Sequence, residues 1–170
     1  AKVVPDDFHA RFTASSRRYR YVIYNNDMRP GILRHAVGWY HRNLDVDKMQ
    51  QAADFLIGEH DFSAFRGAGC QAKNPCRNLQ ALTVERRGKM IVIEAQANAF
   101  LLHMVRNIVG VLLAIGSGAK TPDWSREVLK SKDRRQASVT FSPNGLYLVG
   151  VEYPLVFDLP ENSNGPFFLS

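Results

Sequence analysis

The sequence has 170 residues, of which 45% are hydrophobic, so it is long enough to bury one sizeable core and we expect one domain. Its formal net charge of +6 favours a polyanionic partner, although charge alone does not distinguish nucleic-acid binding from an incidentally basic surface. Two cysteines are too few for a disulfide scaffold, and neither a signal-like leader nor a membrane span is recognisable, which predicts a cytoplasmic protein with no membrane partner.

Residues 17–24 are the first predicted strand, because aromatic and β-branched residues are concentrated there. Alternation along the strand gives one face with Tyr19, Tyr21 and Ile23 and another with Arg18, Arg20 and Val22. Rings and guanidinium groups together suit an RNA-binding surface, where the charges meet phosphates and an exposed base stacks on a ring. The alternative is an ordinary sheet strand with an aromatic core face and a wet arginine face.

Turn-forming residues follow this strand and end it. A helix is predicted from residue 46, with Asp45 as its N-cap and Gly58 as its stop. Residues 60–66 are predicted to form a short helical turn capped by Asp61. Residues 67–77 form a flexible basic loop, which suits either RNA contact or a solvated connection.

Two strands, at residues 79–87 and 90–98, are predicted around a hairpin turn, and the second strand has an alternating apolar face. A helix begins at the Thr121 N-cap and extends to about residue 130, and residues 146–153 form the last strand. This order of elements predicts an α+β domain in which an antiparallel sheet carries helices packed on one face.

The longest apolar run, residues 98–117, is predicted to be the central helix, because apolar residues recur in it at spacings of three and four. A second stripe at helical spacing contains Ala99, His103, Arg106, Gly110 and Ala114. Because burying an unpaired arginine is costly, Arg106 calls for a carboxylate or phosphate partner unless its side chain reaches water over the helix edge. The small residues Gly110 and Ala114 also suit an oligomer interface.

No pattern in the sequence predicts a metal or a cofactor. The residues Cys70, Cys76, His60 and His103 lack the close cysteine pair that anchors a zinc site, and nothing in the sequence places a base beside either cysteine. The glycine-rich segments match neither a phosphate-binding loop nor a dinucleotide fingerprint. We therefore predict reduced cysteines, no metal site and no cofactor.

Three blocks together resemble one family. Residues 8–21 (Phe-His-Ala-Arg-Phe-x4-Arg-Arg-Tyr-Arg-Tyr), 60–66 (His-Asp-Phe-Ser-Ala-Phe-Arg) and 98–110 (Asn-Ala-Phe-x2-His-Met-Val-Arg-Asn-Ile-Val-Gly) are similar to the C-terminal part of the tRNA pseudouridine synthase A family. The segment Gly145-Leu-Tyr-Leu and the Gly-Pro tail continue the likeness, which covers nearly the whole chain. The order and spacing of the blocks make the resemblance specific.

The resemblance implies half of a pseudouridine synthase fold and the isomerisation of uridine to pseudouridine in the anticodon stem-loop of tRNA, by a homodimer without metal or cofactor. In the family, an aspartate attacks the flipped nucleotide at the uracil ring or at the sugar carbon, and the base is rotated and rejoined through carbon. Tyr19 matches the tyrosine that packs on the target base, and Arg106 matches the basic residue that pairs with the aspartate. The resemblance thus implies Arg106 and Tyr19 as catalytic residues, and we expect the substrate-binding residues to be Tyr19, Arg11, Arg18, Arg20 and His103.

The family's aspartate lies in a Gly-Arg-Thr-Asp-Ala-Gly motif, which occurs nowhere in the 170 residues. We do not transfer its role to Asp6, Asp7 or Asp61. We expect residues 1–153 to be the RNA-binding and pocket-completing domain and residues 154–170 to be an extended tail. The nucleophile is then expected in an N-terminal half that this chain lacks, and the chain is expected to be inactive alone. The alternative is a non-catalytic RNA-binding module.

Overall fold

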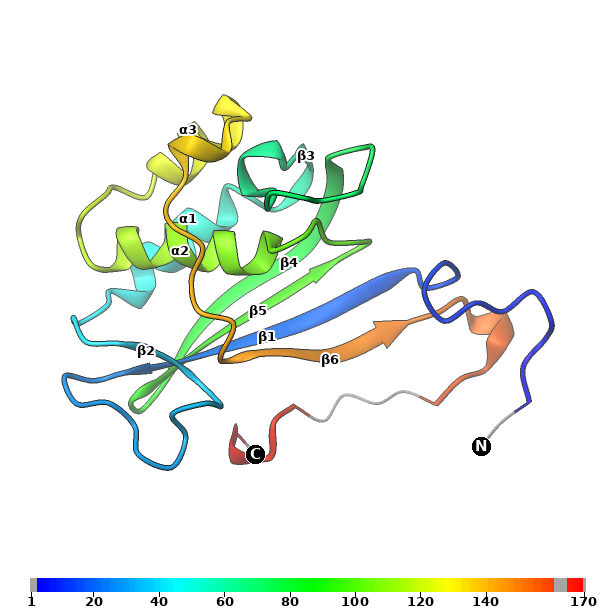
Figure 1. Cartoon of the computed structure of the whole chain (residues 1–170), viewed down its shortest axis with the longest axis horizontal. Helices are drawn as coiled ribbons and strands as arrows, with labels where there is room; N and C mark the ends of the chain where they lie inside the picture. The colour runs from blue at the N-terminus through cyan, green and yellow to red at the C-terminus, as the bar shows by residue number, and fades with distance from the viewer. Residues whose placement is uncertain (1–2, 161–164, 170) are drawn as a thin grey trace.

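The computed structural model describes residues 3–160 and 165–169. Within these residues, three α-helices and one six-stranded sheet account for most of the regular structure (Figure 1). The elements are β1 (Ser16–Asn25), β2 (Gly38–Tyr40), α1 (Val46–Asp54), β3 (Gly58–Asp61), β4 (Cys76–Arg87), β5 (Met90–Ala97), α2 (Met104–Gly116), α3 (Trp124–Ser131) and β6 (Leu146–Glu152).

The sheet has the strand order β2-β1-β5-β4-β3, and β6 also pairs with β1. Both strands pair with the same edge of β1: β6 pairs with its residues 16–21, and β2 pairs with its residues 23–25. All pairs are antiparallel except β1–β2, which is parallel. The predicted α+β fold is confirmed, with one difference: the sheet is mixed, because residues 26–37 return the chain so that β2 runs in the direction of β1.

The helices lie on one face of the sheet, as predicted (Figure 1). The core is formed between them and the apolar faces of β1 and β5, where Tyr21, Ile23, Ile91 and Ile93 are buried. Every residue of α2 is buried except Arg106 and Ala114. Within the described residues, no helix combines the length and the apolar character needed to cross a membrane.

The central helix is shorter than the sequence predicts. It begins at Met104, because His103 adopts a left-handed conformation (φ 60°, ψ 9°) and residues 98–103 form a non-helical connection from β5. Ala99 and His103 therefore do not belong to a helical stripe with Arg106. Apolar composition predicted the burial of this segment correctly but did not reveal that its first turn is not helical.

Gly110 of α2 is covered by the chain itself and is not free to contact a second copy. A Cβ atom on Gly110 would collide with the carbonyl oxygen of Val139, so the segment that leads towards β6 crosses the helix there. The backbone that packs closely on Gly110 therefore belongs to the same chain.

The other predicted elements are close to those observed. The Asp45 carboxylate accepts a hydrogen bond from the Lys48 amide at 3.0 Å and caps α1, and the Asp61 carboxylate accepts one from the Ser63 amide at 2.9 Å before a single 3₁₀ turn. Helix α3 begins later than predicted, with Asp123 rather than Thr121 at its N-cap position. Strands β2 and β3 were not predicted, because three or four residues carry too little periodicity.

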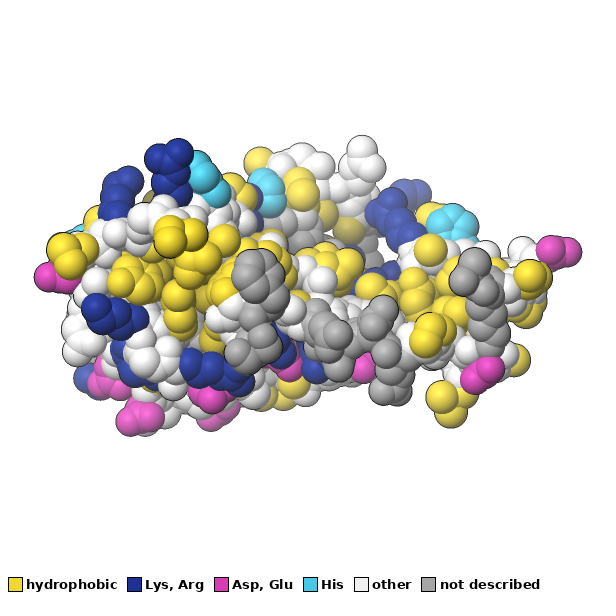
Figure 2. All heavy atoms as spheres, turned by 90° about the horizontal axis from the view of Figure 1, so that it is seen from below, with side chains coloured by type: hydrophobic (Ala, Val, Ile, Leu, Met, Phe, Trp, Pro, Cys, Tyr) yellow, Lys and Arg dark blue, Asp and Glu magenta, His cyan; other side chains and the backbone are white. Residues whose placement is uncertain are grey.

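The face of the sheet away from the helices is partly covered by the C-terminal segment. The Phe168 ring lies 6.0 Å from the Tyr147 ring, and a Cβ atom on Gly165 would collide with the Arg20 guanidinium. Figure 2 views the molecule from this side and shows apolar side chains over a broad area of it. The tail predicted at residues 154–170 thus follows the sheet where it is described, and includes 3₁₀ turns at Leu155–Phe157 and Phe167–Leu169.

A buried tyrosine joins β1 to the segment before β6. The Tyr21 hydroxyl donates to the backbone carbonyls of Ser142 and Asn144, each at 2.7 Å. Burial raises the pKa of Tyr21 well above its ordinary value, and the nearby positive charge of Arg106 opposes this shift only in part. The folded state therefore favours the protonated hydroxyl.

We expect Tyr21→Phe to lower the free energy of unfolding by about 1–3 kcal/mol at neutral pH, because two partly buried carbonyls lose their donor. The unfolded tyrosine ionises near pH 10, whereas the folded one stays protonated to higher pH, so its contribution is fully present below about pH 10 and is lost as the pH rises further. Denaturant unfolding should be measured at pH 7 and above pH 10. The free energy of unfolding should fall less between these pH values in Tyr21→Phe than in the unaltered protein. Equal losses in the two proteins would contradict this assignment.

Candidate functional site

An open groove of about 1070 Å³ lies beside the N-terminal half of β1. Its walls come from segments far apart in the sequence: the residues before β1, the loop between β3 and β4, the connection from β5 to α2, and β6. Its lining includes Arg11, Arg17, Tyr19, Cys70, Arg77, Phe100, His103 and Leu148. Rings and cations therefore share one concave surface.

Tyr19 forms part of the aromatic wall of this groove. Its ring packs edge-to-face on Phe100, with centroids 5.1 Å apart and ring planes at 88°. Its cross-strand neighbour on β5 is Ala95, whose small side chain leaves space beside the ring. The ring is half-buried, so Tyr19 is held in place while it still lines the groove.

Arg17 also lines the groove, although it was not among the predicted substrate-binding residues. Its guanidinium donates to the carbonyls of Ala14 at 2.9 Å and Asn98 at 2.7 Å, and also to that of Arg11. These acceptors are neutral, so the positive charge is held in place without being cancelled. Alternation could have identified Arg17, because it lies two residues before Tyr19 on the same face.

Arg11 and Arg77 add positive charge to the lining of the groove. The Arg11 guanidinium lies 5.6 Å from the centroid of the Phe12 ring, and its side chain is exposed. Arg77 donates to the carbonyls of Asn74 and Cys76, and its buried Nε has no hydrogen-bond partner within the described residues. Part of the predicted basic loop therefore does line the groove, while its last residues belong to β4.

Arg18 and Arg20 are not in the groove. They project from the opposite face of β1, where Arg20 forms an ion pair with Glu94 at 2.6 Å and Arg18 approaches the same carboxylate at 3.5 Å. Their side chains are 28% and 18% exposed, respectively, so Glu94 holds both in a partly buried cluster. The structure thus brings Tyr19, Arg11 and His103 together but separates Arg18 and Arg20 from them.

His103 lies in the groove at the point where the chain enters α2. Left-handed backbone is uncommon for a residue with a side chain, and His103, which adopts it, packs closely on Gly67. The Gly67 amide donates to the Leu102 carbonyl at 2.8 Å, and a Cβ atom on Gly67 would lie 2.9 Å from that oxygen and 3.0 Å from His103 Nδ1. Only glycine at this position lets the loop approach His103 so closely.

Arg106 projects from the first turn of α2 and is half-buried. Its Nε donates to the Phe141 carbonyl at 2.8 Å, and its own carbonyl accepts from the Phe141 amide at 3.3 Å. No carboxylate within residues 3–160 and 165–169 forms an ion pair with it. Its observed partner is therefore a backbone carbonyl, which orients the guanidinium but does not neutralise it. Arg106 lies one turn beyond His103 and is not among the residues that line the groove.

The part of the chain that the structure describes contains no cluster of His, Cys, Asp and Glu that could hold a metal ion. Cys70 and Cys76 are free thiols, and His60 Nε2 lies 2.9 Å from the Ile57 carbonyl oxygen. The backbone amide of Leu102 donates to Cys70 Sγ at 3.4 Å, and this hydrogen bond lowers the pKa of the thiol. Cys70 thus helps to fix the loop against the β5–α2 connection.

A family model described as tRNA pseudouridine synthase matches residues 52–154. The chain belongs to the tRNA pseudouridine synthase family. It is 62% identical to a protein from Coxiella burnetii, 56% to one from Shewanella amazonensis and 54% to one from Vibrio cholerae, all named tRNA pseudouridine synthase A. Each comparison covers 99% of this chain but only 64% or 65% of the relative, so the chain spans about two-thirds of the length of these family members.

We expect Gly67→Ala to disturb the groove, because the added methyl group needs space now filled by the Leu102 carbonyl and the His103 ring. Overpacking of this kind costs about 1–3 kcal/mol of stability. The matched control is Gly31→Ala, since no atom lies within 4 Å of a Cβ at that position. Thermal unfolding and RNA titration of both variants should show losses for Gly67→Ala alone, and similar behaviour of the two would contradict the proposed contact.

Proposed function

We propose that the protein to which this chain belongs isomerises uridine to pseudouridine in tRNA, and that this chain supplies the groove for the target nucleotide. The observation that carries the proposal is the Tyr19–Phe100 pair inside a groove lined by Arg11, Arg17 and Arg77. Membership of the family supports the reaction class. The names of the relatives support tRNA as the substrate.

In this proposal, Tyr19 stacks on the flipped base. Removing a nucleotide from its helical stack costs a few kcal/mol, and stacking on an aromatic side chain returns about 1–3 kcal/mol per base. The groove arginines would take the neighbouring phosphates, because the carbonyls that hold Arg17 and Arg77 leave their charge uncompensated. His103 would contact the nucleotide from the start of α2. Glu94 holds Arg18 and Arg20 on the face of the sheet opposite the groove. We propose that these two arginines affect substrate binding indirectly, by stabilising the sheet that carries Tyr19.

Arg106 is proposed to pair with the nucleophilic aspartate. The printed sequence has no Gly-Arg-Thr-Asp-Ala-Gly segment, so we propose that residues outside these 170 contribute this carboxylate. A carboxylate next to a fixed guanidinium stays ionised and keeps one orientation, both of which a nucleophile needs. The proposal applies to attack at the uracil ring and at the sugar carbon alike, and it requires no metal or cofactor.

The finer features of the proposal follow the family resemblance. They are the anticodon stem-loop as the target, a homodimer as the assembly, and the cytoplasm as the compartment. Residues 1–153 would act as one RNA-binding unit with residues 154–170 as its tail. The Phe157 ring, just beyond that boundary, packs 5.2 Å from Phe8, so the start of the tail is held against the unit.

The experiment measures pseudouridine in tRNA transcripts after incubation with the intact protein and its variants. Arg106→Ala should lower turnover by at least about 100-fold, as the loss of a key electrostatic contact at a reacting centre does, because it leaves the nucleophile unpaired. Arg106→Lys keeps the charge but loses the planar donors, and should retain part of the activity.

Near-normal turnover by Arg106→Ala would remove Arg106 from the mechanism. Absence of pseudouridine with the unaltered intact protein, together with retained tRNA binding, would favour the non-catalytic RNA-binding module. Turnover by the 170 residues alone would contradict the proposed origin of the nucleophile.

A further inference from the structure

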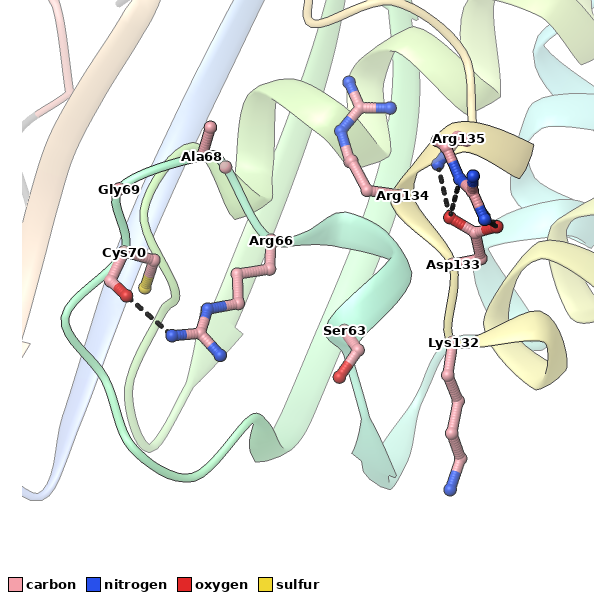
Figure 3. Close-up of a pocket in the computed structure, with 10 residues that line it drawn as sticks. Ser63, Arg66, Ala68, Gly69, Cys70, Lys132, Asp133, Arg134 and Arg135 are labelled. Atoms are coloured by element: carbon pink, nitrogen blue, oxygen red, sulfur yellow. Dashed lines mark hydrogen bonds and ion pairs between the residues drawn. The ribbon is translucent and has the colours of Figure 1, made fainter.

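A second hollow lies directly beyond one wall of the groove. It has a volume of about 620 Å³ and is formed between the loop after β3 and the segment after α3 (Figure 3). Its charged residues are Arg66, Lys132, Asp133, Arg134 and Arg135, and we call it the basic pocket. Gly69 and Cys70 line both the basic pocket and the groove, so one short loop separates the two.

Two of its cations are fixed but not neutralised. Arg66 donates to the carbonyls of Cys70 at 2.6 Å and Ala72 at 2.8 Å, which holds the loop that separates the two hollows. Arg134 donates to the Ser138 carbonyl at 2.8 Å and to the side-chain oxygens of Asn107 and Thr140. All these acceptors are neutral, and neither guanidinium has a carboxylate partner in the described part of the chain.

The other two cations are more exposed to solvent. The Lys132 ammonium lies 3.3 Å from Asp61, and the Arg135 guanidinium lies 2.8 Å from Asp133. Their side chains are 63% and 88% exposed, so water screens both ion pairs, although Arg135 holds Asp133 through both Nε and a terminal nitrogen. The four cations of the basic pocket thus face two carboxylates, those of Asp61 and Asp133. The basic pocket, next to the groove, therefore keeps a net positive charge.

The cations line two sides of the pocket and do not converge on one point. Figure 3 shows Arg66 turned towards Cys70, whereas Lys132, Arg134 and Arg135 project from the opposite segment in different directions. A compact anion such as free phosphate needs donors that converge on a single centre. Cations spread along the walls of an open channel instead suit an extended chain of phosphates.

We propose that the basic pocket binds the phosphodiester backbone of tRNA next to the nucleotide that occupies the groove. This inference rests on the proposed function, because it takes the groove as the site of the target nucleotide. The RNA strand passes over the Gly69–Cys70 segment, and Lys132 and Arg135 exchange their exposed carboxylate partners for phosphates. The contacts are to the backbone, so they add affinity without base preference.

The test uses the intact protein and a double variant, Lys132→Gln with Arg135→Gln, with tRNA affinity measured over a range of salt concentrations. Each phosphate contact contributes about one unit to the slope of log K against log salt, so the slope should fall by about two. The matched control is Lys48→Gln with Arg87→Gln, because Lys48 pairs with Asp45 at 3.2 Å and Arg87 with Glu85 at 2.8 Å. The control removes the same charge from exposed ion pairs away from the pocket.

A lower slope and weaker binding in the pocket variant, but not in the control, would support the proposal. Equal slopes in the two variants would overturn it. A second arm titrates inorganic phosphate: loss of phosphate binding with an unchanged tRNA slope would show a free-anion site and would also overturn the proposal. The result is independent of turnover, so failure of pseudouridine formation with a lowered slope would remove the proposed function and leave the pocket as an RNA contact.

Discussion

The register of β1 against β5 decides which side chains face the groove. Tyr19 lies opposite Ala95, and Arg20 lies opposite Glu94. Because side chains alternate along a strand, a slip of β1 by one residue would turn Tyr19 to the outer face of the sheet. The same slip would turn Arg20, which now pairs with Glu94, towards the groove. The register is fixed by the buried side chains further along the same two strands, including Tyr21 and Ile93. The position of the base-stacking ring is therefore a consequence of core packing.

A second constraint is the path of the chain from β5 into α2. The left-handed turn at His103 packs against Gly67, where a larger residue would collide, and Gly67 lies in the loop that forms one wall of the groove and of the basic pocket. Cys70 and Arg66 hold the same loop through hydrogen bonds to Leu102 and to the loop carbonyls. The groove and the basic pocket therefore share one short wall, and a few contacts fix the shape of that wall. This arrangement is consistent with one RNA strand that occupies both hollows.

The sequence predicted what depends on local periodicity and chemistry. The two faces of β1, the apolar face of β5 and the Asp45 cap of α1 were all predicted correctly. It did not predict what depends on tertiary packing: the late start of α2, the short strand β2, and the backbone carbonyl of Phe141 as the partner of Arg106. For the site, alternation placed Arg18 and Arg20 on the face opposite Tyr19, yet we expected all three to bind substrate, and only Tyr19 of these lines the groove. The same rule identifies Arg17 as a groove residue. Glu94, which pairs with Arg18 and Arg20, could not be identified as their partner without the register of β1 against β5.

We expect the one arginine on the Tyr19 face of β1, Arg17, to bind RNA, and the two on the other face, Arg18 and Arg20, to stabilise the sheet. The most direct measurement compares Arg17→Gln with Arg20→Gln in the intact protein, by tRNA affinity as a function of salt at a temperature where both are folded. Both variants lose hydrogen bonds and should be less stable, since Arg17 bonds three carbonyls and Arg20 bonds Glu94. The account predicts that only Arg17→Gln lowers the salt slope, by about one unit. A lower slope for Arg20→Gln with an unchanged slope for Arg17→Gln would contradict it.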